Sequence, residues 1–354
     1  MSDVKQMQII TFLADDDESR QTRITYPNIA GLNPYQRSLA YWRCVAAFYA
    51  TSARVQPTAR HIFYTNKARP REVAKRNIVN FIKDLGVEVR ELPFRRFRPP
   101  ASVCTRFLNI FYRHEVLYEV ANSNTTLVSL IMDSDCVWLT DAATFLERFG
   151  DGKLHAFEVH QHCDPDFPVH LGLSKRMLGD AFRQLDPAYS TQEPAWYGGE
   201  FFGGTSSALK AFIDEFAEWY TRFVSDDSFA NVSIGGIKLL DTDEFINSFV
   251  LTRGSFEVCN EPWLIHRVWT GPGAAHDGTR YLGRKVLHFP AEKHLGFRAL
   301  YPFCTDFNSE FWTTPLAGFP DFLGGFFGIP QRTRFPAYSL WERTKASLKR
   351  FIKP

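Results

Sequence analysis

The sequence predicts an α/β fold with a mixed, mostly parallel central sheet flanked by helices. Short apolar segments of strand length alternate with amphipathic segments of helix length through residues 7–133. The chain has 354 residues, of which 45% are hydrophobic and 23% are charged, so it can bury one large core. Because strand–helix–strand connections return to the same end of a sheet, the alternation favours parallel strands with both faces covered.

The first half shows the alternation in order. Strands are expected at residues 7–13, 61–66, 87–92 and 127–133, and helices at residues 33–52, 71–86 and 104–120. Asn33 is placed as the N-cap of the first helix and Pro34 as its first residue, where its missing N–H costs nothing. Gly86 is placed to end the second helix.

The second half is less regular and contains a glycine-rich segment, WYGGEFFGGTSS, at residues 196–207. Pairs of glycines flank its short strand, and glycine allows a backbone to approach a ligand closely. The spacing fits neither a P-loop nor a dinucleotide motif. An amphipathic helix is expected at residues 208–224. We expect a catalytic domain at residues 1–300 and an aromatic-rich extension with a basic amphipathic tail at residues 301–354.

Two carboxylates follow the fourth strand, where the sequence reads LVSLIMDSDCVWL. Ligands bind outside the carboxyl ends of parallel strands, so Asp133 and Asp135 are placed to meet one. Two carboxylates this close to an apolar strand require a partner of opposite charge. The same pattern also fits an ordinary turn at the end of a strand.

Composition excludes several classes of protein. A net charge of +2 does not suggest a nucleic-acid binder. The six cysteines are scattered without a C-x-x-C, which favours free thiols in a reducing compartment. No signal peptide or apolar stretch of transmembrane length is apparent, so we expect a cytoplasmic protein.

Three segments occur in order: DSDCVW, WYGGEFFGGTSSALKAF and LDTDEFINSFV. Together they resemble the family of the histo-blood-group A/B transferases and α1,3-galactosyltransferases, which are retaining glycosyltransferases of the GT-A type. A fourth segment, HFPAEKHLGF, is similar to a late His/Lys segment of glycogenin-like enzymes. The likeness covers about residues 8–298. It implies a GT-A-type nucleotide-sugar-binding fold that transfers a hexose, of galactose or N-acetylhexosamine type, from a UDP-sugar to a glycan or lipid-linked saccharide in cell-surface polysaccharide synthesis.

The resemblance also implies roles for single residues. Asp133 and Asp135 would hold Mn²⁺ or Mg²⁺, and His288 is a further candidate ligand. Asp243 would contact a sugar hydroxyl. Glu244 would lie on the far face of the anomeric carbon, as nucleophile or as a stabilising charge. Donor contacts are implied for Phe12, Leu13, Arg106, Asp133, Gly199, Glu200, Lys293 and His294.

Alternatives remain for several of these residues. Arg113 is the other candidate for the role given to Arg106. His288 also fits a strand histidine bonded to backbone. Asp243 and Glu244 also fit an ordinary helix N-terminus, where the dipole favours acids, and a shifted register would use Asp241 or Asp243.

Residues 155–166, HAFEVHQHCDPD, offer histidines, a cysteine and acids that could bind zinc. Strand alternation would place His160 and His162 on one face and Cys163 on the other, so we favour histidines that line an acceptor pocket.

The tail from Leu340 to Pro354 carries five basic residues against one Glu, interleaved with Leu, Trp, Phe and Ile. It fits contact with an anionic membrane at the inner membrane face, or equally a packed helix or frayed end.

Two rival functions are a nucleotidyltransferase and a carbohydrate-binding module without catalysis. A nucleotidyltransferase should carry a glycine-rich basic loop near the first strand, whereas residues 14–20 read ADDDESR. A binding module would need neither a metal nor Glu244.

Overall fold

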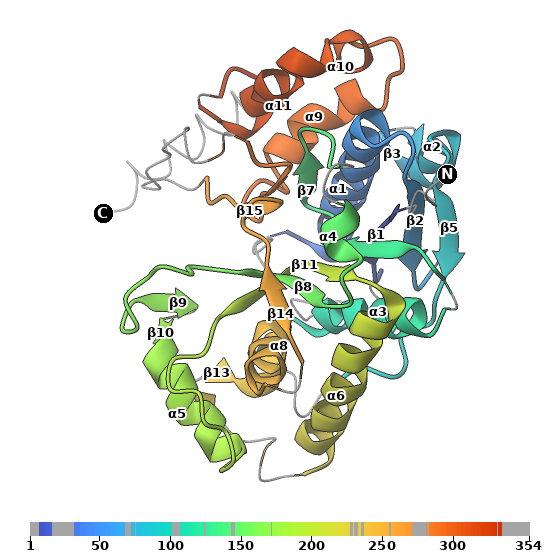
Figure 1. The fold of residues 1–354 in the computed structure, drawn as a ribbon. Coiled ribbons are helices and arrows are strands. Elements are labelled where there is room, and N and C mark those ends of the chain that lie inside the picture. Colours follow the sequence, from blue (N-terminus) through green and yellow to red (C-terminus); the bar gives the residue numbers. More distant parts are fainter. Residues whose placement is uncertain are drawn as a thin grey trace.

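The computed structural model describes residues 7–15, 32–67, 72–74, 76–100, 107–123, 125–142, 146–170, 172–226, 229, 233–234, 237–254, 256–270, 281, 283–330 and 332–334. A seven-stranded sheet forms its centre (Figure 1). In spatial order its strands are β14 (Val258–Asn260), β8 (Leu154–Glu158), β11 (Tyr197–Gly204), β6 (Val128–Met132), β1 (Met7–Leu13), β2 (Arg60–Thr65) and β5 (Glu88–Glu91).

The predicted mixed, mostly parallel sheet is confirmed. Strands β5, β2, β1 and β6 pair in parallel, and β8 pairs in parallel with β14. Only β11 is antiparallel to its neighbours, β6 and β8. Because β11 reverses direction, β8 runs parallel to β6 although the two strands are not adjacent.

A smaller sheet consists of β15 (Ile265–Arg267), β16 (Val286–His288) and β7 (Cys136–Trp138). Its middle strand, β16, is parallel to β15 and antiparallel to β7. The remaining short strands pair as β3 (Glu72–Val73) with β4 (Arg76–Asn77), β9 (Pro168–His170) with β10 (Leu173–Ser174), and β12 (Ser233–Ile234) with β13 (Ile237–Lys238).

Helices cover both faces of the large sheet. On one side α1 (Pro34–Val55) packs against α2 (Ile78–Asp84) and α9 (Gly296–Cys304), and α9 contacts α10 (Glu310–Thr313) and α11 (Phe319–Phe327). On the other side α6 (Ser206–Ser225) packs between α3 (Tyr112–Asn122) and α8 (Asp243–Thr252), as the lower part of Figure 1 shows. Two further helices are α4 (Leu146–Phe149) and α5 (Lys175–Leu185).

The first helix begins as predicted. Asn33 Oδ1 accepts a hydrogen bond from the backbone N–H of Gln36 at 2.8 Å, and Gln36 Oε1 accepts one from the N–H of Asn33 at 3.3 Å. This reciprocal capping box satisfies two N–H groups that the helix itself leaves unpaired. Pro34 follows as the first helical residue.

One predicted helix is shorter than expected, and another begins in a 3₁₀ turn. The helix expected at residues 71–86 is wrong in its first half, because α2 begins only at Ile78, with Asn77 as its N-cap. Ala74 has φ +50°, which no right-handed helix contains. In the helix expected from residue 104, the described part starts as a 3₁₀ turn at Leu108–Phe111 and continues as α3.

The strand geometry expected for residues 160–163 is also wrong. Strand β8 ends at Glu158, and a turn follows in which His160 has φ +58°. Residue 300, the expected domain boundary, lies within α9, and Phe327 of α11 stacks on Phe289 with ring centroids 4.3 Å apart. The basic tail lies outside the described residues. Among the helices that are described, none combines the length and apolarity needed to cross a membrane.

Candidate active site

A cavity of about 410 Å³ lies where β1 and β6 end. From β1 the sheet extends to β2 and β5 on one side and to β6 on the other, so the β1–β6 gap is a topological switch point. Connections leave in opposite directions at such a point and open a crevice at the carboxyl ends of the strands. Phe12 and Leu13, at the end of β1, line the cavity as expected.

The small sheet brings His288 to the two carboxylates. In the β7–β16 pair, His288 lies opposite Cys136, the residue after Asp135. His288 Nε2 is 3.1 Å from Asp135 Oδ2 and 3.9 Å from Asp133 Oδ2. One ligand atom from each of the three residues lies within 4.8 Å of the other two. Two carboxylates and an imidazole at this spacing are a donor set that suits Mn²⁺ or Mg²⁺.

A lysine also neutralises Asp135, at the same carboxylate oxygen that His288 approaches. Lys293 Nζ donates to Asp135 Oδ2 and lies 5.4 Å from the centre of the Tyr41 ring. Burial favours a neutral Asp135, but the charges of Lys293 and His288 prevail and hold the pKa of Asp135 below its ordinary value. Burial likewise opposes a charged His288, yet the adjacent Asp135 raises the pKa of His288 to about 9.

Arg113 joins the first carboxylate to the helix that carries the catalytic candidates. Its guanidinium binds Asp133 Oδ1 and Asp243 Oδ2, each at 2.5 Å. Burial raises the pKa of Asp133, and burial with the nearby charge of Glu244 raises the pKa of Asp243 to about 7, both against the effect of Arg113. A Cβ on Gly199 would meet the guanidinium of Arg113, so this glycine makes room for the bridge.

A second arginine holds Glu244. Arg267, at the end of β15, binds both carboxylate oxygens of Glu200, at 2.8 and 2.5 Å, and reaches Glu244 Oε1 at 2.7 Å. Glu244 Oε2 also accepts from Trp196 Nε1 at 3.1 Å. Burial opposes ionisation of Glu200, but Arg267 outweighs it and lowers the pKa of Glu200. The carboxylate of Glu244 is therefore fixed in orientation at the cavity wall.

Most predicted site residues line this one cavity. They are Phe12, Leu13, Asp133, Asp135, Gly199, Asp243, Glu244, His288 and Lys293. Glu200 is fully buried and lies behind the wall, where Arg267 holds it. His294 and Asp241 are not among the lining residues, and Arg106 lies outside the described residues.

The helix-terminus alternative for Asp243 and Glu244 is also true, because both residues open α8 behind its N-cap, Thr242. This alternative does not exclude a role in the cavity, since the two carboxylates line it.

Within residues 155–166 the structure brings only His160 to the cavity. His162 is exposed and Cys163 is half-buried in the turn after β8.

Sequence reasoning did not identify Arg267 or Trp269, which both line the cavity. A signal for Arg267 existed, since the charge of Glu200 in a glycine-rich strand needs a buried cation. The short segment IHR at residues 265–267 offered one. Trp269 gave no signal in the sequence, and in the structure its side chain is 44% exposed at the cavity.

Comparison with known proteins gives a fold-level likeness only. No protein-family profile and no curated protein matches the chain. Two solved structures of LgtC are similar. One, of an active-site mutant, has 14% identity and a TM-score of 0.44 over 80% of this chain and 87% of that chain. The other, the galactosyltransferase with donor and acceptor sugar analogues, has 16% identity and a TM-score of 0.45 over 88% and 95%. Because both TM-scores are below 0.5, these two likenesses carry no information about the function of this chain.

Proposed function

We propose that the protein is a metal-dependent glycosyltransferase of the GT-A type. It would transfer a hexose, of galactose or N-acetylhexosamine type, from a UDP-sugar to a glycan or lipid-linked saccharide. The observation that carries the proposal is the convergence of Asp133, Asp135 and His288 at the switch-point cavity, with Asp243 and Glu244 on its wall. These residues come from three separate segments whose motifs resemble those of retaining GT-A enzymes.

The charges at the cavity support a divalent cation as part of this function. Five carboxylates gather at the cavity and behind its wall, against three permanent cations and His288, whose pKa is raised to about 9. The carboxylates are Asp133, Asp135, Glu200, Asp243 and Glu244, and the cations are Arg113, Arg267 and Lys293. A bound Mn²⁺ or Mg²⁺ would offset the excess and neutralise the diphosphate that leaves when the glycosidic bond breaks. Asp133, Asp135 and His288 would hold the ion.

The remaining groups divide between the two ends of the donor. Lys293 places an ammonium beside the candidate metal ligands, where it would stabilise charge on the departing phosphate. Phe12 and Leu13 supply an apolar wall for the nucleotide base. The choice of uridine as that base comes from the resemblance of the sequence motifs.

Glu244 is the candidate group at the anomeric carbon. Arg267 and Trp196 fix its carboxylate, with the guanidinium of Arg267 at 2.7 Å and the indole N–H of Trp196 at 3.1 Å. An oriented carboxylate can attack the anomeric carbon or stabilise an oxocarbenium-like transition state. Either role agrees with transfer that retains the anomeric configuration.

Nucleotide binding tests the donor proposal without a known acceptor. Calorimetric titration of the wild-type protein with UDP, GDP, CMP and dTDP should show binding of UDP, and Mn²⁺ should tighten it. Asp135→Asn should lose the Mn²⁺ effect, whereas Asp214→Asn, at an exposed site on α6, should keep it. Equal UDP affinity with Mn²⁺ and with chelator would contradict metal-assisted donor binding.

The acceptor and the cellular site belong to the proposal as well. We propose a saccharide acceptor in cell-surface polysaccharide synthesis, from the resemblance, and action at the cytoplasmic side of a membrane, from the basic amphipathic sequence of residues 340–354. Vesicles of anionic and of neutral lipid, sedimented with the full chain, test the membrane contact. The protein should sediment with the anionic vesicles, and a protein that stays in the supernatant with both would reject the contact.

A further inference from the structure

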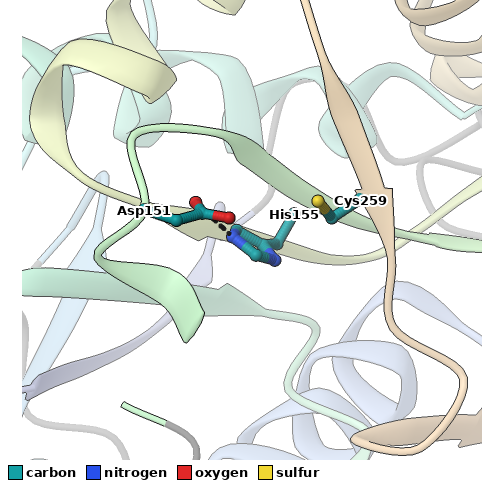
Figure 2. Close-up of side chains that lie close together, drawn as sticks. All are labelled: Asp151, His155 and Cys259. Carbon is teal, nitrogen blue, oxygen red and sulfur yellow. Dashed lines mark hydrogen bonds and ion pairs between the residues drawn. The ribbon is translucent and has the colours of Figure 1, made fainter. Parts of the chain in front are cut away.

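A second cluster of metal-ligating side chains lies at the edge of the large sheet. Cys259 of β14 and His155 of β8 are direct partners in the parallel pairing of the two strands, so their side chains share one face. Asp151 lies in the loop just before β8. Figure 2 shows the three side chains grouped where this loop meets the two strands. One ligand atom from each lies within 4.8 Å of the other two.

The imidazole of His155 is in an unusual electrostatic position. It is 1% exposed, and both ring nitrogens face carboxylates: Nδ1 is 2.7 Å from Glu261 Oε1 and Nε2 is 3.2 Å from Asp151 Oδ1. An imidazole nitrogen and a carboxylate oxygen therefore face each other across the gap between Nε2 and Asp151, where one cation would meet both.

Glu261 selects which nitrogen is left for such a cation. It is fully buried and lies against Nδ1 at the shorter of the two distances, so a metal at His155 would use Nε2, with the Nδ1–H donating to Glu261. A carboxylate behind the histidine is the arrangement that orients imidazole ligands in metal sites. The nearby ammonium of Lys153 binds Glu257 at 3.0 Å and acts on Asp151 only through its longer-range charge.

We propose that Asp151, His155 and Cys259 bind a Zn²⁺ ion, with water in the fourth position. Nitrogen, thiolate and carboxylate are the ligands that zinc takes, and a tetrahedral site places them about 3.4 to 3.6 Å apart. The observed Nε2–Oδ1 separation of 3.2 Å is close to this value. Asp151 is exposed and can adjust, and Cys259 would release its thiol proton to solvent on binding.

The site would fasten the sheet edge that leads to the catalytic cavity. Strand β14 is the outermost strand of the large sheet, and β15 with Arg267 follows it along the chain. An ion shared by β14, β8 and the preceding loop would prevent fraying of this edge. The site is separate from the cavity, because none of its three residues lines the cavity and its ligands include a sulfur.

Thiol alkylation of the wild-type protein tests the proposal. Cys163 provides an internal control, because it is half-buried like Cys259 and is also a free thiol. With Zn²⁺, the rate at which iodoacetamide modifies Cys259, followed by peptide mass spectrometry, should fall by roughly tenfold or more, while the rate at Cys163 stays the same. Equal rates at Cys259 with Zn²⁺ and with chelator would overturn the proposal.

Cobalt substitution gives an independent readout. Co²⁺ bound to a thiolate shows sulfur-to-metal charge-transfer absorption, which a site made of carboxylates and imidazole alone does not. The band should be present in wild type, Cys163→Ser and Asp135→Asn, and absent in Cys259→Ser and His155→Gln. A band that survives in Cys259→Ser, or that disappears in Cys163→Ser, would place the ion elsewhere and contradict the assignment.

Discussion

Gly199→Ala tests the bridge that Arg113 makes between Asp133 and Asp243. The added methyl would lie closer than 3.0 Å to three guanidinium atoms, whereas ordinary contacts are 3.4–4 Å. The guanidinium would have to retreat by about 1 Å, which takes both 2.5 Å ion pairs to the limit of hydrogen bonding. Breaking a buried ion pair costs about 3–5 kcal/mol, a large part of a typical free energy of unfolding.

Urea unfolding measures this loss, and Gly318→Ala is the matched control because a Cβ there meets nothing within 4 Å. The clash also predicts coupling between two sites. In an Arg113→Ala background, the same Gly199→Ala change should destabilise by less than about 1 kcal/mol, because the group it displaces is gone. A free energy of unfolding of Gly199→Ala within about 0.5 kcal/mol of wild type would show that Gly199 is not needed to make room for the Arg113 bridge.

Three further predictions concern stability and catalysis. Burial lowers the pKa of His61, which is hydrogen-bonded to Ser52, from 6.5 to about 4. The unfolded chain therefore binds a proton at a higher pH than the folded protein does, so the free energy of unfolding is complete above pH 6.5 and decreases by roughly 3 kcal/mol as pH falls toward 4. The free energy of unfolding of His61→Gln should lack this decline relative to wild type; parallel pH curves would argue against it. Glu244→Gln should keep the folded structure and UDP binding yet reduce transfer at least about a hundredfold, and an unchanged kcat would remove Glu244 from the mechanism. Asn33→Ala should lower the free energy of unfolding in urea by about 1 kcal/mol through loss of its cap, and no change would show that the cap does not stabilise α1.

The parts of the fold that sequence predicts well are those with strong local signals. The N-cap at Asn33 and the apolar strand before Asp133 each depend on residues a few positions apart, and both are present as expected. The prediction of a helix at residues 71–86 was wrong in its first half, because the apolar periodicity of the sequence begins before the residue at which the helix starts. Asn77, a good N-cap whose side chain accepts from the N–H of Asn80, marked that start.

The site required long-range pairing that no local pattern contains. His288 meets Asp135 because β16 pairs with β7, about 150 residues earlier in the chain. The resemblance of HFPAEKHLGF to other enzymes proposed this contact, whereas periodicity did not. Glu200 was expected to line the pocket, but Arg267 arrives from β15 and holds it behind the wall. A single sequence does not show which residue on a distant strand will pair with a buried charge.

Hydrolysis of nucleotide sugars is the most direct test of metal-dependent glycosyl transfer, because slow transfer to water needs no known acceptor. Wild type, Asp135→Asn and the exposed-site control Asp214→Asn would be assayed with UDP-, GDP-, CMP- and dTDP-sugars, each with Mn²⁺ and with chelator. We predict release of UDP that needs Mn²⁺, is lost in Asp135→Asn and persists in Asp214→Asn. Release that is equally fast with chelator or in Asp135→Asn would contradict it. No release, together with no binding of any nucleotide, would favour a carbohydrate-binding module instead.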